Sequence, residues 1–325
     1  MTQPGTVTSP ALTAQRGSLL AVHAALLVTA VLWGGNFTAV KYLLGELEPL
    51  DVIFVRVVGA AATFVLLLAV SGRVLIPMRR ADAVRLVLIG VIGVTVMNLA
   101  MINGQQLIPA ALASLIVTSN PIHTAIISRV LIGEALTRRK IAGIILAFLG
   151  FLVVLLYGSG EGADFDTSHL KGALIVAIAP FSWAFYTVLS KPLLARYPPV
   201  HVAAYTSIAG AVGFFLTPVI RPGTFDRIGD LSAWGWVAAV FASVLAFAIG
   251  HVLWYRGLQR LTPSQTAVYI YLVPVFGLLS AWLILDERIT AFLILGGATI
   301  LGGVILTNSA RTETRPLQVG AAADE

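Results

Sequence analysis

Long apolar runs constrain this chain more than any other feature. The mean hydropathy is +0.92 and 11% of the residues are charged, compared with about 25% in an ordinary soluble domain. The runs are continuous rather than patterned by face, and several reach the roughly 20 residues that a helix needs to cross a bilayer. Strands of alternating residues are absent, and lipid leaves no backbone group unsatisfied, so helices are expected to do the spanning. The sequence therefore predicts an all-α polytopic membrane protein.

Prolines, charges and glycines divide the apolar sequence into ten expected spans. An acidic turn contains Pro49, a basic stretch covers 73–85, a Gly/Asp/Ser loop covers 158–168, and Pro198 and Pro199 end the sixth span. The first run continues past residue 33 without a convincing cleavage site, so we expect a retained first helix and not a signal peptide. The expected spans are 19–44, 50–71, 84–104, 109–131, 139–157, 170–190, 200–220, 234–257, 263–284 and 290–308.

The distribution of basic residues predicts the orientation of these spans. With the N-terminus inside, the inner segments carry 15 of the 21 Lys and Arg residues, and this bias favours both termini in the cytoplasm. A multi-pass protein of the cell membrane is expected, in a bacterium the inner membrane. The expected domains are a disordered cytoplasmic N-terminus (1–18), a first five-helix repeat (19–157), an external linker (158–169), a second repeat (170–308) and a disordered cytoplasmic tail (309–325).

A sparse set of identical residues recurs 153 positions apart. Pro121, Glu134 and Gly143 in the first half correspond to Pro274, Glu287 and Gly296 in the second. Upstream, with an offset of 150, three more pairs match: Trp33 with Trp183, Lys41 with Lys191, and Pro49 with Pro199. Each repeat holds five spans, an odd number, so the second must insert upside down relative to the first. The sequence predicts ten transmembrane helices in two inverted repeats, an architecture typical of transporters.

Composition also excludes several functional classes. The chain has no cysteine, which excludes disulfides and cysteine-based metal or redox sites. Its net charge of +6 comes from residues scattered through short loops, which favours membrane topology over nucleic-acid binding. None of the 15 acids lies mid-span, and no Walker-type loop, paired Asp-rich motif or His-Glu-x-x-His motif occurs. We therefore expect no catalytic residue, no metal, no cofactor and no ATP-driven cycle.

These features together resemble the drug/metabolite transporter superfamily, specifically its EamA-type permeases, over residues 20–308. The matching elements are the WGGNF motif at 33–37, Arg56, Pro121 followed by GEALT at 133–137, and Pro274 followed by DERIT at 286–290. The resemblance implies a basket of ten helices around a central cavity lined by spans one, three, four, six, eight and nine. It does not imply a particular substrate.

Two aromatic and polar pairs are the leading candidates for the cavity wall. Trp33 and Asn36 are repeat-related to Trp183 and Tyr186, and each pair is spaced i, i+3 on one helix face. An amide and a phenol beside indoles would suit a flat or amphipathic organic molecule. The alternative is a structural role for aromatics near the interface. Asn98 is a weaker candidate, because small polar residues also hold membrane helices together.

Three ionisable residues lie within the apolar runs. His123 and His251 could relay a proton or bind substrate, or each could simply bond to a neighbouring helix. Arg56 is expected either to function or to be a structural arginine that pairs with Asp51. Glu134 is expected to form a helix-end salt bridge or gate latch beside Arg138 and Arg139, and Pro121 and Pro274 to act as hinges or static kinks.

The sequence thus predicts a secondary permease for a small organic metabolite such as an amino acid or an amphipathic compound. It would work by alternating access, with export favoured over import. Energy would come from the substrate gradient or from a proton carried by His123 or His251. The expected partners are the substrate and the lipid bilayer, and the oligomeric state stays open. The rival is a membrane-embedded enzyme acting on a lipid-linked substrate, which clustered carboxylates or a metal set would favour.

Overall fold

The structure, a computed structural model, describes residues 10–72, 74–105, 107, 116–157, 170–285 and 291–309. These residues form helices joined by short turns, and no strand occurs among them. The expected linker at 158–169 and residues 310–325 of the expected tail lie outside the described residues. The all-helical expectation is confirmed for the described part of the chain.

The helices follow the apolar runs. The first begins at Pro10, ahead of the expected start at residue 19. Several runs change helix type without a break in the chain. The elements are α1 (Pro10–Glu46), α2 (Pro49–Val70), α3 (Arg80–Gly90), η1 (Val91–Val96), α4 (Met97–Gln105), α6 (Asn120–Ile132), α7 (Arg138–Tyr157), α8 (Leu170–Leu194), α9 (Pro199–Ala211), η3 (Val212–Leu216), α10 (Thr217–Ile220), α11 (Thr224–Gly229), α12 (Ala233–Val240), η4 (Phe241–Ile249), α13 (Gly250–Arg260), α14 (Pro263–Ala267), η5 (Val268–Tyr271), α15 (Leu272–Leu285) and α16 (Ala291–Ser309).

Six of these helical runs are long and apolar enough to cross a membrane. They are Leu19–Glu46, Pro49–Val70, Arg80–Gly104, Leu170–Leu194, Pro199–Ile220 and Ala233–Arg260. Two shorter apolar helices, Ile116–Ile132 and Ile294–Ser309, accompany them. A helix of 20 or so apolar residues matches the thickness of the hydrocarbon core. The chain is therefore a multi-pass membrane protein.

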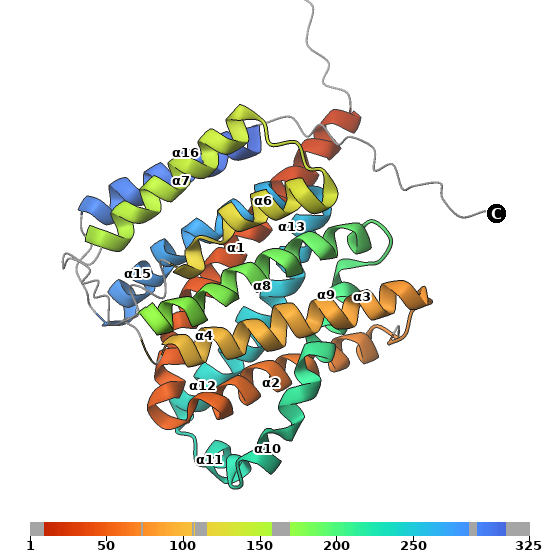
Figure 1. Ribbon diagram of the computed structural model, residues 1–325, viewed down its shortest axis with the longest axis vertical. Helices are drawn as coiled ribbons and strands as arrows, with labels where there is room; N and C mark the ends of the chain where they lie inside the picture. Colours follow the sequence, from red (N-terminus) through yellow and green to blue (C-terminus); the bar gives the residue numbers. More distant parts are fainter. Residues whose placement is uncertain are drawn as a thin grey trace, which may run out of the picture.

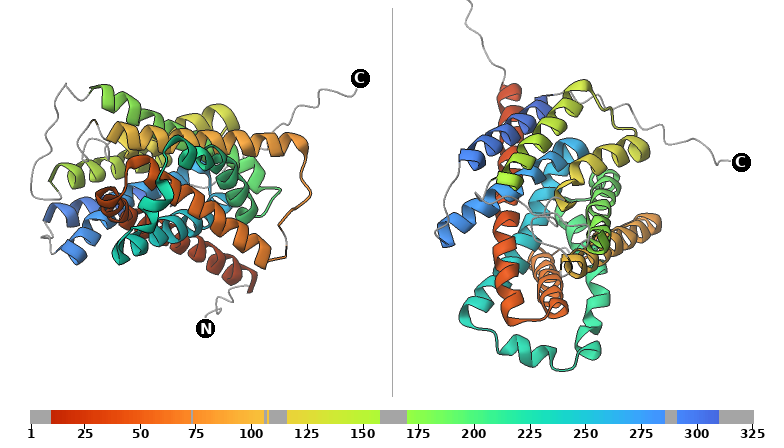
Figure 2. Two further views of the ribbon diagram at one scale, coloured as in Figure 1. Left: turned by 90° about the horizontal axis from the view of Figure 1, so that it is seen from below. Right: turned by 60° about the vertical axis from the view of Figure 1, so that its left-hand side comes forward.

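The long helices run roughly side by side and define two ends of the bundle (Figure 1). At the α1/α2 end, α1 stops and α2 begins; at the opposite α2/α3 end, α2 stops and α3 begins. Helices α7 and α16 lie together along one flank, and α10 and α11 cover the opposite flank (Figure 1). The turned views show the same pairing of α7 with α16 (Figure 2).

Glycines allow α7 and α16 to approach closely. A Cβ atom on Gly143 would meet Thr307 and Gly303, and one on Gly150 would lie 2.8 Å from the carbonyl oxygen of Gly296. No side chain larger than hydrogen fits at these positions without moving a backbone. Small residues that bring backbones together are a common means of helix association in membranes.

Two helical runs contain a π-helical segment. The segment η1 interrupts the run from α3 to α4, and η4 interrupts the run from α12 to α13. They begin at Val91 and Phe241, 150 positions apart, the offset that relates the two halves of the sequence. A π-helix is rare and is frequently found at functional sites, because its wider turn displaces backbone carbonyls from their usual partners.

An exposed acid and a buried one tie the α1/α2 end together. The Glu46 carboxylate accepts hydrogen bonds from the Ser232 amide (2.9 Å) and hydroxyl (2.6 Å) at the start of α12. Asp51, fully buried, accepts from the Thr224 hydroxyl at 2.8 Å and from Arg227 Nε at 2.7 Å. That bond and the charge of Asp51 raise the pKa of the Arg227 guanidinium above its ordinary value.

Different polar groups link the helices at the α2/α3 end. Asp82 on α3 accepts from Arg196 Nη1 at 3.1 Å and from the Tyr197 hydroxyl at 2.9 Å. The Tyr205 hydroxyl donates to the carbonyl of Val74 at 2.8 Å. These bonds join the loop before α3, and α3 itself, to the end of α8 and to α9.

The partner of Glu134 differs from the one expected. Its carboxylate lies 2.9 Å from Lys140 Nζ, and the two side chains are only 3% and 2% exposed. It also accepts from the Ser264 amide at the start of α14, at 3.3 Å. Arg138 and Arg139 are exposed, because they lie on the face of α7 turned away from the bundle. The expectation of a helix-end ion pair holds, but its partner is Lys140.

Candidate functional site

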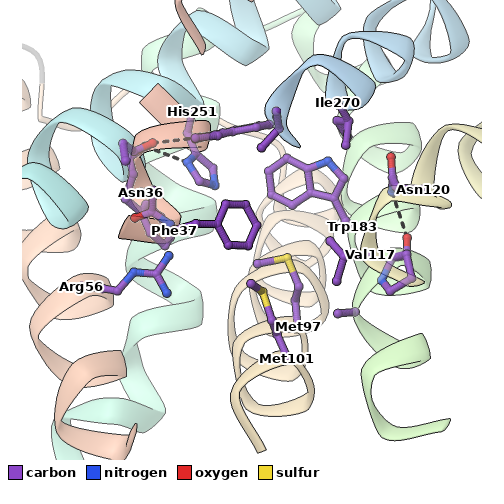
Figure 3. A pocket seen from close by; sticks show the side chains of 16 residues that line it. Asn36, Phe37, Arg56, Met97, Met101, Val117, Asn120, Trp183, His251 and Ile270 are labelled. Atoms are coloured by element: carbon purple, nitrogen blue, oxygen red, sulfur yellow. Dashed lines mark hydrogen bonds between the residues drawn. The ribbon is translucent and has the colours of Figure 1, made fainter. Parts of the chain in front are cut away.

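A cavity of about 130 Å³ lies between the two halves of the chain. The first half contributes Trp33, Asn36, Phe37, Arg56, Met97 and Met101 to its wall. The second half contributes Trp183, Ala246, Phe247, His251, Ile270 and Val273. Apolar and aromatic groups dominate, with a few polar groups among them (Figure 3).

Tryptophans form the part of the wall toward the α2/α3 end. The rings of Trp33 and Trp183 meet edge to face, with centroids 5.2 Å apart. Trp254, only 1% exposed, lies 5.1 Å from Trp33. Tyr186 stacks beneath Trp183 at 5.0 Å, and Tyr255 stacks on Tyr186 at 5.4 Å. These buried rings close the cavity toward that end of the bundle.

The π-helix η4 fixes two of the wall side chains. Trp33 Nε1–H donates to the carbonyl of Ala246 at 2.9 Å, and His251 Nδ1 lies 2.7 Å from the carbonyl of Phe247. A carbonyl can only accept, so Nδ1 carries the hydrogen, and Nε2 of the neutral ring is left as an acceptor. The Phe247 ring packs against the imidazole with centroids 4.2 Å apart. His251 is thus held with Nε2 buried and without a partner.

Several buried polar atoms of the wall have no hydrogen-bond partner. They are Asn36 Oδ1, Arg56 Nε, Trp183 Nε1 and His251 Nε2. Buried polar groups are normally paired, so an unpaired cluster needs a reason. Asn36, Arg56 and His251 lie on one side of the cavity and Trp183 on the other (Figure 3). A molecule in the cavity could reach both sets.

Four of the seven predicted site residues line the cavity: Trp33, Asn36, Trp183 and His251. A fifth, Tyr186, lies behind Trp183 in the aromatic stack, and its hydroxyl is 3.3 Å from Thr206 Oγ1. Their role in substrate binding stays a prediction.

The other two predicted site residues lie outside the cavity wall. Asn98 is buried on α4, where Nδ2 donates to the carbonyl of Val94 at 2.7 Å. The half-buried His123 ring lies 4.1 Å from the ring of Phe181, and Nδ1 is 3.3 Å from Ser119 Oγ. Both side chains already bond to their own helix.

Sequence reasoning missed several residues of the wall. For Arg56 the sequence left open a functional role or a structural pairing with Asp51; the pairing is wrong, because Asp51 bonds to Thr224 and Arg227. The sequence signal for Arg56 was a charged residue within an apolar run. Phe37, Met97 and Met101 carry no signal that separates them from apolar residues facing lipid.

A multi-pass helical bundle with a mostly apolar cavity between its two halves is an architecture typical of membrane transport proteins. A family model described as the EamA-like transporter family matches the chain twice, over residues 20–156 and 170–309. The chain belongs to the EamA-like transporter family.

Relatives named as transporters, an exporter and an efflux pump agree with this assignment. A probable terminal-alkyne amino-acid exporter of Streptantibioticus cattleyicolor is 30% identical over 287 residues, covering 87% of this chain and 92% of that protein. A probable amino-acid metabolite efflux pump of Escherichia coli is 26% identical over 307 residues, covering 91% and 97%. An uncharacterized transporter of Archaeoglobus fulgidus is 26% identical over 281 residues, covering 86% and 96%.

A solved crystal structure shares the fold. It superposes with a TM-score of 0.72 over 87% of this chain and 96% of that one, at 22% sequence identity. At this level of identity the similarity concerns the fold alone.

Proposed function

We propose that this protein is a secondary transporter that moves a small amphipathic metabolite through the central cavity by alternating access. The cavity itself carries the proposal: it lies between the two halves, has an apolar wall, and presents buried polar atoms that lack partners. Trp254 and Tyr255, at 1% and 0% exposure, close it toward the α2/α3 end. A site closed on one side at a time is what alternating access requires.

Symmetric contacts support an architecture of ten helices in two inverted repeats. Gly143 packs on Gly303, and Gly150 packs on Gly296. Shifting the first-half residues forward by 153, and the second-half residues back by 153, exchanges these two contacts, as a two-fold axis between α7 and α16 would. Trp33 and Trp183, themselves repeat-related, touch each other at the cavity. The proposed repeats are 19–157 and 170–308.

Lys191 forms a contact, here called the Lys191 latch, that supports alternating access. Lys191 Nζ on α8 donates to the carbonyls of Leu258 (2.6 Å) and Leu261 (2.8 Å) at the end of α13, as well as to Gln259 (3.1 Å). Its repeat mate Lys41 is exposed at the α1/α2 end. In an inverted-repeat transporter the second state arises when each half adopts the conformation of the other. We infer that the Lys191 latch opens as an equivalent latch forms at Lys41.

The membrane orientation, the direction of transport and the energy source are proposed as the sequence predicts them. The charge bias favours both termini in the cytoplasm of a bacterial inner membrane, which puts the α1/α2 end outside. Export is proposed because two of the relatives are named as an exporter and an efflux pump. With no mid-span carboxylate, coupling would use the substrate gradient or a proton on His251 or His123, and His251 is the one in the cavity wall.

A flux measurement in everted membrane vesicles tests the proposal. Vesicles that contain the protein are incubated with a mixture of amino acids and apolar metabolites, and their contents are analysed by mass spectrometry. We expect saturable accumulation of at least one unmodified compound, lost in Trp183→Ala and reduced in Asn36→Ala. Trp236→Ala, at a tryptophan that is 45% exposed, serves as the matched control and should leave the flux unchanged.

Two outcomes would contradict the proposal. One is that no compound accumulates above the level of empty vesicles. The other is that Trp183→Ala, present in equal amount, transports as well as the wild type. Recovery of a chemically altered compound would instead favour the membrane-embedded enzyme.

A further inference from the structure

We propose that Arg56 binds the carboxylate of the transported molecule, so that the cavity selects amphipathic organic acids with a single negative charge. The inference rests on the proposed function, because it names the chemical class that the same cavity takes. Neither the comparisons nor the sequence assigns this role to Arg56.

The environment of Arg56 first shows that its charge is not used by the protein itself. The residue lies on the first half of α2 and is 8% exposed, and its Nε is fully buried without a partner. No described residue forms a hydrogen bond or an ion pair with its guanidinium. Its side chain reaches toward the cavity below Asn36 and Phe37 (Figure 3). A buried, unpaired cation is strongly unfavourable, and inside a membrane protein such a group is usually functional.

The nearby acids are committed elsewhere. Glu46 binds Ser232, Asp51 binds Arg227, and Glu48 forms an ion pair with Arg221. No acid belongs to the described wall of the cavity. The negative charge that Arg56 lacks must therefore come from the ligand.

The shape of the guanidinium and the rest of the wall restrict that ligand. A planar guanidinium binds a carboxylate through two parallel hydrogen bonds. A doubly charged phosphate ester would need a second cation, and Arg56 is the only Lys or Arg of the described wall. Phe37, Met97, Met101 and Phe247 offer an apolar surface for the remainder of the molecule.

An additional ammonium group on the ligand is tolerated but not required. Asn36 Oδ1 is an unpaired acceptor. Neutral oxygens can accept from an ammonium, but they do not replace a carboxylate partner. The carboxylate is thus the essential group, with or without an amine beside it.

Binding of matched phenyl compounds to the purified full-length protein tests the inference. The probes are 3-phenylpropionate, phenylalanine, phenylalaninamide and 2-phenylethylamine, followed by aliphatic and indole carboxylates of graded length. We expect carboxylates to raise the melting temperature and the amide and amine to leave it unchanged. Arg56→Gln should weaken carboxylate binding roughly ten- to a hundred-fold, the usual range for a charge-assisted hydrogen bond. Arg56→Lys should bind with intermediate affinity.

Two controls separate binding from folding. Arg221→Gln removes a partly exposed arginine outside the cavity and should bind carboxylates as the wild type does. Arg56→Met should leave the melting temperature of the ligand-free protein equal to or above the wild-type value, because it removes an unpaired buried charge. A structural arginine would show the reverse, with a lowered melting temperature.

Several results would overturn the inference. These are equal binding of 3-phenylpropionate by wild type and Arg56→Gln, preference for the amine over the acid, or no stabilisation by any carboxylate of the series. The inference about Arg56 can fail while the proposed transport function holds. Flux of an amine or neutral compound that depends on Trp183 but not on Arg56 would keep the transporter and exclude the carboxylate anchor.

Discussion

Arg56, the buried charged residue at the cavity, has an unpaired Nε, whereas the buried charges elsewhere in the described chain are paired. Glu134 and Lys140 satisfy each other, and Thr262 and Ser264 complete the bonds around them. Asp51 is likewise fully bonded by Thr224 and Arg227. The contrast separates groups that hold the bundle together from groups left available to a ligand.

The Glu134–Lys140 pair offers a stability test at the residue scale. Glu134→Gln should destabilise the protein by about 3–5 kcal/mol, because it leaves the Lys140 ammonium buried without its counter-charge. Thermal unfolding in detergent measures the effect. The double variant Glu134→Gln/Lys140→Met should recover most of the loss, since neither charge then remains. A double variant as unstable as the single one would mean that the pair is not what holds α6, α7 and α14 together.

At the scale of single residues, the sequence predicted part of the cavity wall. Trp33, Asn36, Trp183 and His251 were read from repeat pairing and from polar groups in apolar runs, and all four line the cavity. Sequence could not show that the Asn98 amide bonds back to Val94 on its own helix. Similarly, the Tyr186 hydroxyl lies beside Thr206, a contact made only by the folded bundle.

At the scale of elements, the structure departs most from the sequence in its helix types. Apolar runs predict helices, and the described helices follow the expected spans. The π-helical segments η1 and η4 were not foreseen, because a change of hydrogen-bond register depends on tertiary packing and leaves no pattern in an apolar sequence. Their equivalent starting points support the view that both halves were built to one plan.

Close packing of α7 on α16 gives a prediction with a neighbouring control. A Cβ on Gly303 would lie 2.5 Å from the Ala147 amide nitrogen and 2.6 Å from the Gly143 carbonyl oxygen. Gly303→Ala should therefore destabilise by about 1–3 kcal/mol, as overpacking does. At Gly302 the nearest atom would be the Leu146 side chain at 3.9 Å, so Gly302→Ala should unfold at or above the wild-type temperature. Equal melting temperatures for the two variants would show that α7 and α16 are not in this contact.

The molecule as a whole is two similar halves around a cavity. Length, hydropathy and repeated residues were enough to predict an all-helical membrane protein. The EamA type was predicted from the resemblance of its motifs, and the family match covers both halves. The orientation of the protein across the bilayer is inferred from the charge bias alone, because the arrangement of the helices is the same for either direction of insertion. The substrate depends on a few side chains of the wall. Among them, Arg56 was left open between function and structure, because α2 was not expected to line the cavity.

Single cysteines test the orientation, since the natural chain has none. Asp226, Arg80 and Arg138 are all exposed. Asp226→Cys should react with an impermeant thiol reagent in intact cells. Arg80→Cys and Arg138→Cys should react only after the membrane is opened. Labelling of Arg138→Cys in intact cells would reverse the proposed topology.

The most direct test of alternating access measures both ends of the bundle at once. Spin labels at Ala195 and Arg260 report the end closed by Lys191, and labels at Gly45 and Leu107 occupy the repeat-equivalent positions at the other end; all four residues are exposed. Double electron–electron resonance gives the distance within each pair, before and after Lys191→Met removes the three latch bonds. The account predicts that Ala195–Arg260 lengthens while Gly45–Leu107 shortens. A change confined to the Ala195–Arg260 pair, or no change at either end, would contradict it.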